Sequence, residues 1–247
     1  MTSEKLQDLH VICYKWGTLY DASYVNKLAS MVRRHLSIRH SFHCITDNAE
    51  GLDPAIIVHP IPDYGFQGIW RKLMTFQEDF LGLCGAHVLS VDIDVVVIRS
   101  LDFVAERADT DFLIARNWAK GTRGSGSLYR LKVGSCPHVW NEFIANPELA
   151  IERFHGKNRL IGEQNWLENH IRNFQFFPDG KVVSYKRHCK AKGHVLKIGP
   201  VEIFNTARFG VATPPQGAAL VSFHGDPSSS GGDARPLRPV AACPFRL

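Results

Sequence analysis

The sequence predicts a single α/β domain built on an open, twisted, mixed sheet of the Rossmann-like type, flanked by helices. Three observations point to this class. Short apolar segments of strand length alternate with segments of helical periodicity. Polar residues follow several of the predicted strands, where ligands bind in open α/β sheets. The chain has 247 residues, of which 45% are hydrophobic, enough for one domain with a full core.

The first predicted strand is apolar, and the segment after it has the features of a helix. Asp21 is suited to cap this helix, because its carboxylate can accept from backbone N–H groups of the first turn. Turn signals and prolines close the next two strands, and a second helix precedes a fourth strand that runs into Asp92. The strands are predicted over His10–Trp16, Ser41–Thr46 and Ala55–Ile61, and the helices over Asp21–His35 and Gly68–Phe80.

The later part of the chain mixes short elements with glycine-rich sequence. The Pro-Asp-Gly sequence at 178–180 predicts a hairpin-type turn between two extended pieces. We expect the domain to extend over residues 1–225, and residues 226–247, rich in Pro, Ser and Gly, to form a loose C-terminal tail. The remaining predictions are helices over Ser100–Arg107, His138–Phe154 and Gly162–Ile171, strands over Asp111–Trp118, Leu128–Val133 and Ala218–His224, and extended pieces within Phe176–Lys186.

Charge and cysteine content exclude several classes of protein. The net charge of +5, from 29 basic and 24 acidic residues, is too weak and dispersed for a nucleic-acid-binding protein, but suits a polyanionic ligand or an anionic membrane surface. The six cysteines lack C-x-x-C spacing, so no structural zinc site is expected. The N-terminus has no signal-peptide pattern, and no apolar run has the length of a membrane span. We expect a cytoplasmic protein. Peripheral contact with the inner membrane stays open as a possibility.

The most informative motif is Asp92-Ile93-Asp94, which interrupts an apolar, β-branched run. Side chains alternate along a strand, so the two carboxylates point the same way, about 7 Å apart at their stems, and Ile93 points into the core. Two acids on one face at a strand end can hold a divalent cation, which in turn can hold a diphosphate. The alternative interpretation is an Asp-containing turn between two strands.

Several short motifs follow one another along the chain. They are the first strand with a loop and helix carrying Tyr20 and Tyr24, Trp70-Arg71-Lys72-Leu73, Asp92-Ile93-Asp94, Gly124-Ser125-Gly126-Ser127-Leu128, Gly162-Glu163-Gln164-Asn165 and Phe223-His224-Gly225. In this order the chain resembles metal-dependent, nucleotide-sugar glycosyltransferases of the GT-A fold, closest to glycosyltransferase family 8. The resemblance covers most of residues 10–225. No single motif is specific, but the ordered set is fairly specific.

The resemblance implies a Mn²⁺ or Mg²⁺ ion between the protein and a UDP-sugar donor. Asp94 and His224 would be metal ligands, and Asp92 would bridge toward the ribose and the metal. Gly225 lacks a side chain, so the backbone could approach the diphosphate closely. Taken alone, His224 could be a surface or core histidine. Its place after a predicted strand, with the two acids upstream, favours the ligand role.

The resemblance also implies a nucleotide-binding loop after the first strand. Residues 14–20 would hold the uracil, with an aromatic ring from Tyr14, Trp16 or Tyr20 for stacking. Tyr14 or Trp16 could equally be core residues. Asp47 would meet the base or the ribose, and its alternative role is to cap a turn.

The reacting centre implied by the resemblance contains Gln164 and Glu163, and the reaction would retain the configuration of the sugar. Glu163 could instead be a first-turn acid favoured by the helix dipole. Lys72 would lie near the phosphates, with Arg71 as its rival for this role. The alternative for Lys72 is a solvated helix face with its aliphatic stem on the core.

Two departures from the family pattern leave other functions open. The lysine expected after Phe223-His224-Gly225 is absent, and Gly124 stands where an asparagine is expected. The alternatives are a non-catalytic module that binds a nucleotide-sugar or a glycan, and a sugar nucleotidyltransferase. A nucleotidyltransferase would need a glycine-rich, basic loop after the first strand, and residues 14–20 have one glycine and one lysine. For a glycosyltransferase, the acceptor would be a glycan, a lipid-linked oligosaccharide or a protein.

Overall fold

The computed structural model describes residues 4–118, 121–154, 162–172, 174–190, 195–198, 201–205 and 212–223. The predicted tail over residues 226–247 lies outside these ranges. Within them, no helix combines the length and the apolar character needed to cross a membrane.

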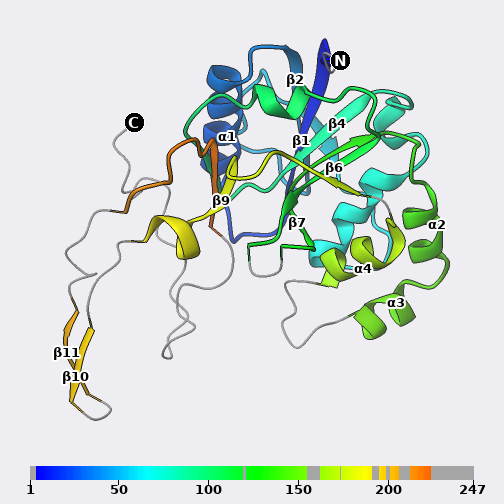
Figure 1. Cartoon of the computed structure of the whole chain (residues 1–247). Coiled ribbons are helices and arrows are strands. Elements are labelled where there is room, and N and C mark those ends of the chain that lie inside the picture. The colour runs from blue at the N-terminus through cyan, green and yellow to red at the C-terminus, as the bar shows by residue number, and fades with distance from the viewer. Residues whose placement is uncertain are drawn as a thin grey trace.

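A seven-stranded mixed sheet forms the centre of the domain (Figure 1). From one edge to the other, its strands are β3 (Ile57–Pro60), β2 (Arg39–Thr46), β1 (Asp8–Lys15), β4 (His87–Val91), β7 (Gly124–Lys132), β6 (Phe112–Arg116) and β8 (Gln175–Phe176). The first four are parallel to one another. β7 is antiparallel to both β4 and β6, so β6 runs in the direction of β4. This architecture confirms the predicted α/β class with an open, mixed sheet.

A smaller sheet continues the chain beyond β4. It contains β5 (Val95–Val97), β12 (Leu220–Ser222) and β9 (Val182–Ser184), with β12 in the middle. The turn predicted at residues 178–180 is present between two extended pieces, with the N–H of Lys181 donating to the carbonyl of Pro178 at 3.4 Å. The two pieces do not form a hairpin with each other, because β8 pairs with β6 in the main sheet while β9 pairs with β12. A two-stranded hairpin of β10 (Val195–Ile198) and β11 (Val201–Asn205) stands apart from both sheets in Figure 1.

Helices cover both faces of the main sheet (Figure 1). On one face, α1 (Ala22–His35) packs together with β5. The Asp21 carboxylate accepts from the backbone N–H of Ser23 at 2.9 Å, which confirms the predicted cap. On the other face, η1 (Gly68–Phe76), α2 (His138–Ala145) and α4 (Gly162–His170) enclose an aromatic core. The shorter elements are η2 (Phe80–Gly82), η3 (Asp102–Ala105), α3 (Pro147–Phe154) and the π-helix η5 (Tyr185–Cys189).

Two predicted helices differ from the observed ones. The helix expected over residues 68–80 is a 3₁₀ helix that ends at Phe76, and it buries consecutive residues rather than one stripe. The helix expected over residues 138–154 is two helices. Pro147 has no N–H to donate and disfavours helical geometry at the residue before it, and Asn146 accordingly lies at φ −156° and ψ 79°.

Candidate functional site

The polar residues predicted at strand ends share one edge of the main sheet, because β1, β2 and β4 are parallel. Trp16 follows β1, Asp47 follows β2 and Asp92 follows β4. The exposed Asp47 carboxylate accepts from the backbone N–H of Gly17 at 2.8 Å, which ties the loop after β1 to the end of β2. Gly17 has a φ of +61°, a conformation that glycine adopts without strain. The carboxyl edge therefore carries the polar groups that ligands meet in open α/β sheets.

Asp92 and Asp94 lie in the turn by which the chain leaves the main sheet for β5. The backbone N–H of Asp92 donates to the carbonyl of Ser127 on β7 at 3.0 Å. The backbone carbonyl of Asp94 accepts from the N–H of Phe223, the residue after β12, at 3.2 Å. Ile93 is buried in the core, as predicted. The motif thus forms a turn between two strands, which was the alternative interpretation of the sequence. A half-buried acid lies on either side of Ile93 in this turn.

Asp94 lies in an environment that disfavours its negative charge. Burial and the charge of Asp92 raise the pKa of Asp94 to about 7. The Tyr20 hydroxyl lies 3.5 Å from Asp94 Oδ2, and burial together with the charge of Asp94 raises the pKa of Tyr20. Two neighbouring carboxylates of this kind are stabilised by a cation, and oxygen ligands are those that Mg²⁺ and Mn²⁺ prefer. The chemistry of this donor set therefore fits a divalent metal.

Lys72 of η1 connects Asp92 to a carboxylate in the interior. Its Nζ donates to Asp92 Oδ1 at 2.8 Å and to the carbonyl of Gly126 at 2.9 Å, and it lies 3.5 Å from Glu163 Oε1. Lys72 is 5% exposed and Glu163 2%, whereas about a third of the Asp92 side chain reaches solvent (34%). Lys72 is therefore a buried residue and not part of a solvated helix face.

The charges of these three residues depend on one another. Burial alone lowers the pKa of Lys72, but the charges of Asp92 and Glu163 outweigh it and raise that pKa above its usual value. Burial raises the pKa of Glu163, and the ammonium of Lys72 opposes this shift. Glu163 Oε1 has no hydrogen-bond partner within the described residues. Lys72 is therefore cationic, and it is the charged group that compensates Glu163 in the interior.

Glycines allow these side chains to approach. A Cβ on Gly126 would lie 2.8 Å from Glu163 Oε1, and a Cβ on Gly162 would lie 2.5 Å from the ring of Trp70. Likewise, a Cβ on Gly124 would lie 2.7 Å from Ile114 on the neighbouring strand β6. The glycine-rich segment before residue 128 is consequently the first part of β7, which the sequence placed at Leu128.

Gln164 lies in the first turn of α4, next to Glu163. Its Nε2 donates to the carbonyl of Gly124 at 2.6 Å, which fixes the amide against the start of β7. Arg123 ties the same two elements together by donating to Asn165 Oδ1 at 2.6 Å and pairing with Glu168. Sequence reasoning missed the Arg123 contacts, because no local pattern links it to α4.

Other predicted site residues lie elsewhere or outside the described ranges. Tyr14 is 6% exposed and its hydroxyl pairs with Thr75 Oγ1 at 2.7 Å, so it is a core residue, the alternative that the sequence left open. Trp16 is half-buried at the border of the same core. His224 and Gly225 lie outside the described residues. Across those residues, no group of three or more His, Cys, Asp or Glu side chains is arranged to hold a metal.

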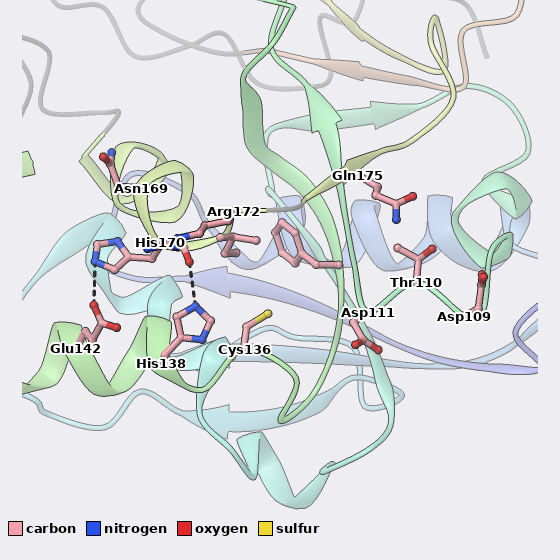
Figure 2. A pocket seen from close by; sticks show the side chains of 12 residues that line it. Asp109, Thr110, Asp111, Cys136, His138, Glu142, Asn169, His170, Arg172 and Gln175 are labelled. Atoms are coloured by element: carbon pink, nitrogen blue, oxygen red, sulfur yellow. Dashed lines mark hydrogen bonds and ion pairs between the residues drawn. The ribbon is translucent and has the colours of Figure 1, made fainter.

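A hollow of about 660 Å³ lies away from this edge. Figure 2 shows it, with His138, Glu142 and His170 among its lining residues. His170 Nε2 lies 3.4 Å from Glu142 Oε2, and His138 Nε2 lies 2.9 Å from the carbonyl of His170. Phe112, another lining residue, opens β6, which runs parallel to β4. The hollow is therefore at the opposite end of the main sheet from Asp92.

Comparison with known proteins identifies the fold. A crystal structure of the galactosyltransferase LgtC in complex with donor and acceptor sugar analogues matches with a TM-score of 0.55 and 11% identity, over 87% of each chain. A variant of LgtC in which an active-site glutamine is replaced by glutamate matches with a TM-score of 0.56 and 12% identity, over 88% of each chain. No protein-family profile and no curated protein matches the sequence. The chain has the GT-A glycosyltransferase fold of these structures.

Proposed function

We propose that this protein is a glycosyltransferase that transfers a sugar from a UDP-sugar donor to a glycan, lipid-linked or protein acceptor with the help of Mn²⁺ or Mg²⁺. The fold it shares with LgtC, a galactosyltransferase crystallised with donor and acceptor sugar analogues, supports this reaction class. The observation that carries the proposal is the turn after β4. It presents Asp92 and Asp94 at the carboxyl edge of the sheet, with the residue before His224 hydrogen-bonded to Asp94.

Asp92, Asp94 and His224 would hold the metal. A bound divalent cation neutralises charge on a departing nucleoside diphosphate. The ammonium of Lys72 holds the Asp92 carboxylate in place and compensates the charge of Glu163 behind it. The hydroxyl of Tyr20 donates to Asp94 Oδ2 at 3.5 Å and would help to orient that carboxylate.

The donor would lie along the carboxyl edge. The loop after β1, fixed by the contact between Gly17 and Asp47, is placed to hold the nucleoside, and Trp16 at its start offers a half-buried ring for the base. Gly225 would allow the backbone to approach the diphosphate. Tyr14 is left out of this proposal, because its ring is in the core.

Gln164 and Glu163 would form the reacting centre on the side of the site opposite the nucleoside. Gln164 is the stronger candidate of the two, because it is half-buried and its amide orientation is fixed by Gly124. The fold neighbour in which an active-site glutamine was replaced supports a glutamine in such a role. Glu163 contacts Lys72 rather than solvent. Its effect on the reaction would therefore be indirect, through the position of Lys72. A retaining course of reaction is part of this proposal.

The experiment is donor hydrolysis by the purified protein across a panel of nucleotide-sugars, with and without Mn²⁺. We expect slow UDP release from one donor, lost on chelation and reduced about a hundredfold by Asp94→Asn. Asp179→Asn, which removes an exposed acid paired with Arg116, is the matched control and should leave the rate unchanged. Equal rates with and without chelator contradict the metal-dependent mechanism. Metal-dependent UDP binding without turnover of any donor would instead indicate a non-catalytic nucleotide-sugar-binding module.

A further inference from the structure

Three histidines lie on one face of the main sheet, on the neighbouring strands β1, β2 and β3. Residues before and after His10, and before and after His43, belong to the core on the α1 side. Because side chains alternate along a strand, His10 and His43 point to the other face, together with Ser41. His59 on β3 pairs in register with the strand position two residues after His43, so it shares this face.

The polar atoms of this cluster are within bonding distance of one another. His10 Nδ1 and His43 Nε2 are 3.2 Å apart. Ser41 Oγ lies 2.9 Å from the first nitrogen and 2.7 Å from the second. Two ring nitrogens and one hydroxyl oxygen thus form a compact triangle with one N or O atom from each side chain.

The separation of the two nitrogens matches that of two ligands on one metal ion. Zn–N bonds of about 2.0–2.1 Å in a tetrahedral site place two ligand nitrogens about 3.3 Å apart. The observed 3.2 Å needs almost no adjustment of His10 or His43. Imidazole suits Zn²⁺, Cu²⁺ and Ni²⁺, whereas Mg²⁺ prefers oxygen ligands.

His59 supplies the outer contact that a metal-binding histidine needs. Its Nε2 lies 2.9 Å from Nδ1 of His43, and the two rings are stacked with centroids 5.2 Å apart. A proton on His43 Nδ1 donated to His59 leaves the lone pair of His43 on Nε2, which faces His10 and Ser41. Ligating histidines are usually oriented in this way by a partner on their other nitrogen.

The cluster is accessible from solvent. His43 is 5% exposed, but His10, Ser41 and His59 are half-buried and reach solvent.

We propose that His10 and His43 bind one transition-metal ion of the Zn²⁺ class, with solvent completing its coordination and Ser41 as a hydrogen-bonding neighbour of the two ligands. This site uses ring nitrogens from the middle of the sheet face and is separate from Asp92 and Asp94, which follow the end of β4. It does not depend on the proposed glycosyltransferase function.

The test is calorimetric titration of the full chain with Zn²⁺, in a background carrying Asp92→Asn and Asp94→Asn so that the carboxylates do not contribute. We expect one ion per chain, with affinity reduced about tenfold or more by His10→Gln and by His43→Gln. His40→Gln is the control, since His40 lies on β2 and its Nδ1 bonds the carbonyl of Ile38 rather than the cluster. Equal affinity in all variants, or no saturable binding by the background protein, overturns the proposal.

A second readout covers the case in which replacing the buried His43 impairs folding. Cu²⁺ bound to the background protein should show hyperfine coupling to two equivalent nitrogens by electron paramagnetic resonance. His10→Gln, at a half-buried position, should reduce this to one nitrogen, and His40→Gln should leave two. A spectrum without nitrogen coupling, or one that His10→Gln does not change, contradicts the assignment.

Discussion

Replacing Lys72 with methionine tests whether the buried ion pair holds the site together. Lys72 Nζ and Glu163 Oε1 are 3.5 Å apart, and both side chains are almost fully buried. At an effective dielectric constant of about 20, their attraction is about 5 kcal/mol, which burial of the two charges largely offsets. Removing the cation alone leaves Glu163 as an uncompensated buried charge. We therefore expect Lys72→Met to lower the free energy of unfolding by about 3–5 kcal/mol.

Urea denaturation followed by circular dichroism measures this loss, and the melting temperature should fall by about 10 °C. Lys132→Met is the matched control, because Lys132 is exposed on β7, and it should change stability by less than about 0.5 kcal/mol. The double variant Lys72→Met/Glu163→Gln separates the pair from simple loss of packing. Since a neutral amide in place of the Glu163 carboxylate needs no cation, the second substitution should restore about 2 kcal/mol relative to additivity. Additive effects of the two substitutions would refute the ion-pair reasoning.

Two further predictions concern packing and protonation away from that pair. Gly162→Ala should destabilise the protein by about 1–3 kcal/mol in urea titrations, because the new Cβ would meet Trp70, which is stacked on Phe143; a neutral result would contradict the close approach. Gly121→Ala, whose Cβ would meet no atom closer than 3.8 Å, is its control. Burial and the charge of Arg130 lower the pKa of His87 to about 4, compared with 6.5 in the unfolded chain. The neutral form of His87 therefore stabilises the fold above pH 6.5, and this contribution of about 1–3 kcal/mol is lost as the pH falls toward 4. The dependence of the free energy of unfolding on pH between 4 and 6.5 should be weaker in His87→Gln than in the parent protein, and His138→Gln, at an exposed position, is the control. An unchanged pH dependence in His87→Gln would show that the pKa of His87 is not lowered by folding.

Local sequence patterns predicted most of the central sheet. The predicted strand His10–Trp16 and the predicted helix Asp21–His35 match β1 and α1 to within two residues at each end, because apolar runs and an N-cap are local signals. The small sheet was not predicted as a separate unit. β5 has three residues, and its pairing with β12 joins segments more than a hundred residues apart, which no local period encodes.

The site was predicted as a set of residue types, but not as contacts. Glu163 was expected either at the reacting centre or as an acid at the start of a helix, and the structure adds that it is buried against Lys72. This contact requires the side-chain-free surface of Gly126 and the packing of η1 against α4, which only the assembled fold supplies. Tyr14 is the opposite case, a predicted site residue that the assembled fold places in the core. Its aromatic ring suited a binding loop, and its burial depends on Thr75, far along the chain.

The contacts of Lys72 also constrain how a phosphate could be held. An ammonium has three N–H donors; Lys72 uses two of them for Asp92 Oδ1 and the carbonyl of Gly126, and it lies 3.5 Å from Glu163 Oε1 as an ion-pair partner. A direct bond from Lys72 to a donor phosphate that displaced the carbonyl of Gly126 would leave a buried acceptor unsatisfied, which costs about 1–3 kcal/mol. In the proposed glycosyltransferase, Lys72 would therefore contribute to the diphosphate site by orienting Asp92. The positive charge that meets the phosphate would then be that of the divalent metal.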